Sequence, residues 1–234
     1  MRSSTRRQLK QDQFAEAAME TVHWAAEHRQ KLIWGGIIVA IVLGIGLSIW
    51  AYRAHRESQA VEAFGHAMQV YAAPLKSEDP AAPEPSYATS AERSKAAHDA
   101  FSKVAAQFSG LPSGKKALYL SGVTALDIGD KTSAERDFQQ VINSAGSDVA
   151  SLAKLALANL YRDSGRQQDA VKLYKDLIDH PTHEVPKAYA QLQLAAVFTS
   201  SQPAEAKRIY EDVKKENPQS PAAQAADMRL QSIQ

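Results

Sequence analysis

The pattern of apolar and polar positions divides the chain into one uninterrupted apolar stretch and a longer amphipathic remainder. Residues 32–52 include no charged side chain. At about 1.5 Å of rise per residue, a helix of this length crosses the apolar core of a bilayer. The residues that follow are too polar to form a second span. The pattern therefore predicts one transmembrane helix at 32–52, followed by a helical domain.

The ends of the apolar stretch favour a permanent anchor over a cleaved signal peptide. Trp34 lies near one end and Trp50 and Tyr52 at the other, and aromatic rings prefer the two headgroup levels of a bilayer. The tail before the stretch, residues 1–31, is long for the charged region of a signal peptide. The sequence Ala51-Tyr52-Arg53 is also a poor match to the small-x-small pattern of a cleavage site. We therefore expect the stretch to be retained.

Small side chains recur every four residues along the stretch, which places them on one face of a helix. Such a face lets a second helix approach closely, although small residues are also common in membrane helices. We treat this face as a candidate for helix packing. Its residues are Gly36, Ala40, Gly44 and Ser48.

The distribution of lysine and arginine sets the expected orientation. The tail holds six of these residues, whereas only Arg53 and Arg56 precede Lys76 on the other side. Immediately beside the stretch the numbers are equal, with Arg29 and Lys31 on the tail side. Cytoplasmic segments carry the excess of positive charge. The tail total therefore predicts a cytoplasmic N-terminus and a translocated C-terminal domain.

The segment 53–108 is predicted to hold two helices and a loop. No proline occurs from Arg53 to Ala73, so the anchor is expected to continue as a stalk helix. Residues 74–86 are rich in Pro, Ala, Glu and Ser, a composition typical of a loop. A second helix is expected at about 89–108. The apolar stripe of the stalk consists of Val61, Phe64, Met68 and Tyr71.

An internal repeat with a step of 36 residues occupies 109–234. Each unit is predicted to be a helix, a turn at a glycine and a second helix, and such pairs must stack to bury their apolar faces. Ser220 and Pro221 predict the start of a final capping helix. The repeated positions are Ala134, Ala170 and Ala206; Phe138, Tyr174 and Tyr210; Val141, Leu177 and Val213; and Gly129, Gly165 and, in third place, Ser201.

These positions resemble the tetratricopeptide repeat. The middle unit matches best, with Leu157-Ala158-x-x-Tyr161, then Gly165 and Ala170, in the order of that family's pattern. The first unit departs from it with Ala125 where tyrosine is usual, and the step of 36 exceeds the usual value of about 34. The expected fold is therefore all-α, with one N-terminal transmembrane helix followed by a tetratricopeptide-like helix-pair solenoid.

The whole arrangement of tail, span, stalk and repeats is similar to the YfgM-like ancillary subunits of the Sec translocon. This resemblance implies a bacterial cytoplasmic (inner) membrane protein with a periplasmic repeat domain. Its implied partners are translocon subunits, a membrane-anchored chaperone and exported chains, with a second copy of the chain also left open. The alternative is a structural adaptor in cell-wall or outer-membrane assembly.

A helix-pair solenoid offers a groove for a peptide or a partner helix. The position of side chains in the repeat gives six candidates for this groove. The alternative is that the two aromatic residues belong to the core and the others to an ordinary solvated face. The candidates are Lys116, Tyr119, Asn159, Arg162, Gln191 and Phe198.

Composition and motifs argue against other functions. The net charge of +1 provides no basic stripe for nucleic acid, and the absence of cysteine excludes disulfides and thiolate ligands. The segment 110–116 is one residue short of a phosphate loop and is expected to be a turn between helices. His180 and His183 are expected in a solvated loop. We therefore expect no cofactor, no metal and no enzymatic activity.

Overall fold

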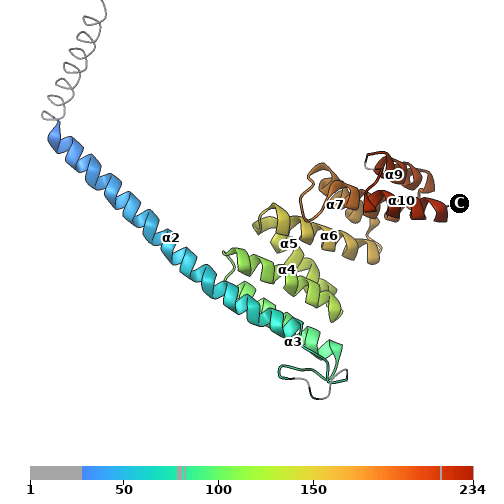
Figure 1. The fold of residues 1–234 in the computed structure, drawn as a ribbon, viewed down its shortest axis with the longest axis horizontal. Helices are drawn as coiled ribbons and strands as arrows, with labels where there is room; N and C mark the ends of the chain where they lie inside the picture. The colour runs from blue at the N-terminus through green and yellow to red at the C-terminus, as the bar shows by residue number, and fades with distance from the viewer. Residues whose placement is uncertain (1–27, 78–80, 82, 217, 234) are drawn as a thin grey trace, which may run out of the picture. The chain divides into compact units, whose positions relative to one another are not determined.

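The computed structural model describes residues 28–77, 81, 83–216 and 218–233. These residues are predominantly α-helical, which confirms the all-α prediction (Figure 1). The predicted tail, up to residue 27, lies outside these ranges. The helices are α2 (Arg29–Tyr71), α3 (Ser90–Gln107), α4 (Pro112–Asp127), α5 (Lys131–Ser144), α6 (Ser147–Asp163), α7 (Gln167–Asp179), α8 (Lys187–Phe198), α9 (Pro203–Glu216) and α10 (Pro221–Ser232).

The chain divides into two compact units, and the boundary between them falls between His55 and Arg56. The described part of the first unit is the N-terminal portion of α2. Its apolar side chains are exposed, and the most apolar window has a mean hydropathy of 2.5. Within the described residues, α2 is the one helix long and apolar enough to cross a membrane. The helix runs without a break from Arg29 to Tyr71, so the predicted span and stalk belong to one helix.

The second unit is a sequential stack of helices. From α3 onward, each helix packs against the next one along the chain. Figure 1 shows this succession from α4 to α10. Ser220 caps α10 by accepting a hydrogen bond from the Ala223 amide, and Pro221 occupies the first turn as expected. This arrangement is that of a tetratricopeptide-like array.

The repeated sequence positions form the centre of the stack. Every alanine, aromatic and aliphatic residue of the three columns is at most 1% exposed. The small residue lets the neighbouring helix approach, and the aromatic ring fills the space that remains. Gly122 shows how close this packing is, because a Cβ atom there would lie 2.7 Å from the Phe138 ring.

Two of the three repeat turns use the same glycine-dependent geometry. Gly129 and Gly165 have φ values of +83° and +77°, which favour glycine. The amide of the residue after each glycine donates a hydrogen bond to a carbonyl of the preceding helix. The Arg166 amide, for example, donates to the Tyr161 carbonyl at 2.8 Å. Ser201 cannot copy this turn, since no described residue other than glycine has a positive φ. The third turn is therefore built differently.

The structure adds a helix pair before the repeats found in the sequence. On α3, Ala97, Phe101 and Val104 reproduce the repeated pattern 37 residues before the first unit, and all three are buried. They pack against the C-terminal part of α2, where the Phe101 ring lies 5.9 Å from Phe64 and 6.1 Å from Tyr71. The stalk therefore serves as the first helix of a pair.

The expected turn at 110–116 is wrong for most of its length. Helix α4 begins at Pro112, so Gly114 and Lys116 are helical. A Cβ atom on Gly114 would lie 1.9 Å from the Phe108 carbonyl oxygen. The glycine that suggested a phosphate loop is thus explained by the close approach of the end of α3.

We expect Gly122→Ala to destabilise the second unit by about 1–3 kcal/mol, because the new methyl group overlaps the Phe138 ring. The measurement is the thermal midpoint of helix unfolding for the full chain in detergent. Gly110→Ala is the matched control, since Gly110 has open space around it. Combining Gly122→Ala with Phe138→Leu should cost less than the two single changes together. Additive effects would contradict this packing.

Candidate partner-binding surfaces

The first helices of successive pairs, α2, α4 and α6, share one side of the second unit, which we call the first-helix face. A hollow of about 410 Å³ lies on this face. Side chains from the three helices and from the loop after α7 line it. They are Phe64, Lys116, Tyr119, Leu120, Asp148, Val149, Leu152 and Glu184.

The hollow has an apolar floor and a charged rim. Tyr119 is partly buried, and its ring lies 6.0 Å from the Phe138 ring of the core. Burial raises the pKa of the Tyr119 hydroxyl, which therefore stays neutral. Lys116, Asp148 and Glu184 supply charges of both signs. Such a surface suits an apolar segment of a polypeptide flanked by polar groups.

Four of the six groove candidates are on α4 and α6. Lys116 and Tyr119 line the hollow together. Asn159 accepts a hydrogen bond from the Tyr174 hydroxyl at 2.7 Å, and burial raises the pKa of Tyr174 to about 12. Arg162 donates to Gln193 at 3.2 Å and to Asp163 at 2.9 Å. Asn159 and Arg162 thus connect neighbouring helices.

The other two candidates lie on a different surface. Gln191 and Phe198 line a separate pocket between α7, α8 and α9. The reason is one extra residue before α8: Leu157-Ala158 recurs as Leu194-Ala195 after 37 residues, not 36. One residue turns a helix by about 100°. The six candidates therefore do not share one groove, and their role in partner binding stays a prediction.

The sequence analysis did not single out several residues of the hollow. Leu152 could have been found, since it follows Lys116 by one repeat step of 36. Phe64 was assigned to the stalk, whose packing against the repeats was not foreseen. Asp148 and Glu184 are also one repeat step of 36 residues apart, so the same step could have identified them as an acidic pair.

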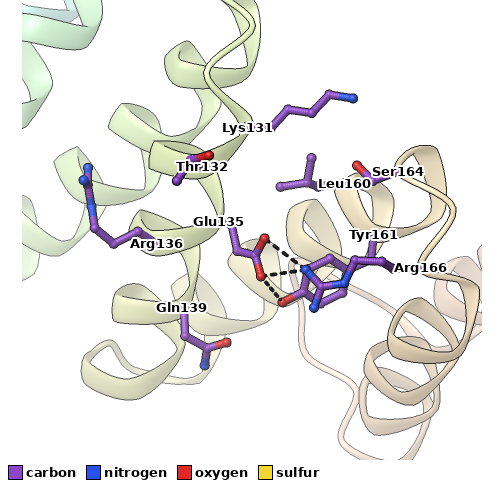
Figure 2. A pocket seen from close by; sticks show the side chains of 9 residues that line it. All are labelled: Lys131, Thr132, Glu135, Arg136, Gln139, Leu160, Tyr161, Ser164 and Arg166. Carbon is purple, nitrogen blue, oxygen red and sulfur yellow. Dashed lines mark hydrogen bonds and ion pairs between the residues drawn. The ribbon is translucent and has the colours of Figure 1, made fainter.

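A charged cluster joins α5 to the start of α7, beside a pocket of about 530 Å³ (Figure 2). Glu135 accepts hydrogen bonds from Arg166 at 2.8 Å and from the Tyr161 hydroxyl at 2.9 Å. The Arg166 guanidinium also lies 3.8 Å from the centre of the Tyr161 ring. The hydrogen bond from Arg166 holds the pKa of Glu135 below its usual value. These groups satisfy one another, so the cluster holds neighbouring pairs together.

A second polar cluster is buried where α3, α4 and α5 meet. Asp137 is 3% exposed and accepts from Ser121 at 2.7 Å and from the Arg136 side chain at 2.9 Å. His98 lies beside Ser121, with its Nδ1 atom 3.0 Å from the Ser121 carbonyl oxygen. Ser121 is fully buried and its hydroxyl donates to the carboxylate, so it is not placed as a nucleophile.

The remaining sequence predictions concern metals and the membrane helix. Within the described ranges, no group of three or more His, Asp and Glu side chains could hold a metal ion, and His180 and His183 are exposed. On the small-residue face, Ser48 donates to the Gly44 carbonyl at 2.8 Å. Gly36 and Ala40 are also exposed. The use of this face for helix packing stays a prediction.

The stacked helix pairs and the apolar N-terminal helix define an α-helical repeat protein of tetratricopeptide type with one candidate membrane span. A family model described as "Tetratricopeptide repeat-like domain" matches residues 22–234, so the chain belongs to this family, which is of the YfgM type. The comparisons with curated proteins and with solved structures give no match. Domains of this family mediate protein–protein interactions and are typically non-catalytic.

We expect Glu135→Gln to change the acid sensitivity of the second unit. The pKa of Glu135 is lowered from 4.5 in the folded state, so this carboxylate stabilises the fold above that pH, and the stabilisation is lost as the pH falls through the lowered value. The thermal midpoint of the unaltered chain should therefore fall more steeply than that of the variant between about pH 5 and pH 3. Glu211→Gln, at an exposed position of α9, is the control. Identical slopes would refute the expectation.

Proposed function

We propose that this chain is a membrane-anchored periplasmic interaction scaffold in the bacterial cytoplasmic membrane. The observation that carries the proposal is the exposure of the apolar side chains of α2. Trp34, Leu47 and Trp50 are each at least 64% exposed, and no part of the described chain covers them. Water would solvate such a surface poorly, whereas a bilayer would cover it.

The partners we propose are the Sec translocon, membrane-anchored chaperones and exported chains. The family membership supports a protein partner, and the first-helix hollow supports one with an apolar segment. Newly exported chains expose such segments before they fold. The hollow is open and has both signs of charge on its rim, which suits transient contact with varied sequences.

The proposed orientation places the N-terminal tail in the cytoplasm and the repeats in the periplasm. The excess of Lys and Arg in the tail supports it. The absence of cysteine from the chain also suits a domain exposed to an oxidising compartment. A retained α2 would then keep the repeat domain at the membrane.

The orientation can be measured with single cysteines, because the chain contains none of its own. We expect Glu211→Cys, at an exposed position of α9, to react with a membrane-impermeant maleimide in cells whose outer membrane has been permeabilised. Ser4→Cys in the tail should react only after the cytoplasmic membrane is opened. The reverse pattern would overturn the proposed orientation. Labelling of both cysteines while the cytoplasmic membrane is still intact would argue against a span.

Photocrosslinking in intact membranes tests the partners. We expect a photoreactive residue at Lys116, on the rim of the hollow, to capture chaperones or exported chains. The control is Lys103, which is exposed on α3 and does not line the hollow. A photoreactive residue at Ala40 should capture translocon subunits more strongly than one at Val42, which lies on another face of α2.

The same experiment separates the two classes of function. Capture of cell-wall or outer-membrane assembly proteins at Lys116, unchanged when protein export is blocked, would favour the structural adaptor. Equal capture at Lys116 and Lys103 would remove the hollow from the proposal. Recovery of no envelope protein at any position would refute the scaffold.

A further inference from the structure

The pocket between α7, α8 and α9, which we call the α8 pocket, has a volume of about 460 Å³. It is separate from the first-helix hollow, with which it shares no lining residue. Its apolar wall includes Leu194, Phe198 and Ile209. Three carboxylates, of Asp179, Glu205 and Asp212, are also part of the lining.

Gln191 contributes an unsatisfied polar group to this pocket. Gln191 is 8% exposed. Its Oε1 atom is buried and has no hydrogen-bond partner in the part of the chain that the structure describes. Rotation of the amide about its last bond exchanges the places of its oxygen and its nitrogen. A buried amide oxygen without a donor is unfavourable, and a ligand that supplies a donor removes that penalty.

The neighbouring repeat shows which group fills the corresponding place. Gln191 follows Lys154 by the 37-residue step of α8, and Asp212 follows Asp176 by the 36-residue step of α9. In the earlier repeat, the Lys154 ammonium lies 2.5 Å from an Asp176 carboxylate oxygen. The hydrogen bond from Lys154 holds the pKa of Asp176 below its usual range. A lysine ammonium thus joins the first and second helices there.

The later repeat has the carboxylate without this ammonium. Asp212 forms an ion pair with Arg208 at 3.8 Å, and Arg208 is also bonded to Glu205 at 2.6 Å and 3.0 Å. The lining as a whole contains three carboxylates, of Asp179, Glu205 and Asp212, against the two cations of Lys175 and Arg208. The pocket therefore carries one uncompensated negative charge.

We propose that the α8 pocket binds a lysine side chain of a partner polypeptide. The ammonium takes the place that Lys154 fills in the preceding repeat, between the Asp212 carboxylate and the Gln191 amide oxygen. The four-carbon stem lies against Leu194 and Phe198. An ammonium is a compact donor on a flexible apolar stem, which matches a pocket that has both an apolar wall and hydrogen-bond acceptors. This inference rests on the proposed role as a protein scaffold and names a feature of the partner.

The test compares two labelled octapeptides of alanine and leucine, identical except for one central residue. One peptide carries lysine and the other norleucine, which keeps the apolar stem and lacks the ammonium. Fluorescence anisotropy of the peptides with the full chain in detergent gives both dissociation constants. We expect the lysine peptide to bind at least fivefold more tightly, with the difference reduced by salt. Equal affinities would overturn the proposal.

Gln191→Lys is the decisive variant because it installs the chain's own ammonium opposite Asp212, as in the preceding repeat. We expect it to keep or raise the thermal midpoint while removing the preference for the lysine peptide. Asp212→Asn should also remove the preference, and Glu211→Gln, outside the pocket, should leave it intact. A preference that survives Gln191→Lys would overturn the proposal, whatever the folding of Asp212→Asn.

Crosslinking keeps this inference separate from the proposed function. Capture of translocon or chaperone partners at Ala40 or Lys116, together with no lysine preference, would refute only the α8 pocket. A lysine preference in a chain that captures no such partner would refute the translocon assignment and leave the pocket standing.

Discussion

The second unit depends on one packing interaction, in which an aromatic ring of each second helix fills the space left by a small residue. Phe138, Tyr174 and Tyr210 are at most 1% exposed, and each follows a fully buried alanine by four residues. Because the small residue sets how closely the helices approach, the ring has almost no alternative volume. Gly122 shows the same constraint, because a Cβ atom there would lie 2.7 Å from the Phe138 ring.

Much of this packing could be predicted from the sequence, because buried positions repeat with a fixed step. The alanine and aromatic columns identified the second helices and their turns. The pair formed by α2 and α3 was not recognised, since its helices are joined by the long loop after Tyr71 instead of a glycine turn. Phe101 nevertheless occupies the same place in the repeated pattern as Phe138, 37 residues earlier in the sequence.

The candidate site was harder to predict because a surface residue changes sides when the register slips. A single additional residue before α8 displaces each position extrapolated with the 36-residue step by one residue, which is about 100° around that helix. Gln191 and Phe198, expected on the first-helix face, therefore line the α8 pocket. Core columns tolerate such a slip, since α8 still buries Leu194 and Ala195. Side chains at the surface have no comparable restraint, so their positions required the structure.

The packing that recurs from repeat to repeat and the variation at the surface of the repeats have a common physical origin. Substitution of a buried column residue would leave a cavity or an overlap, so the columns recur. The ion pair between Lys154 and Asp176 lies at the edge of the core, and its loss in the next repeat costs little as long as the helices still pack. The array can thus keep its fold while one repeat exchanges an internal ion pair for an open acceptor. In an array of equivalent units, such an exchange would give one unit the proposed preference for lysine, which the others lack.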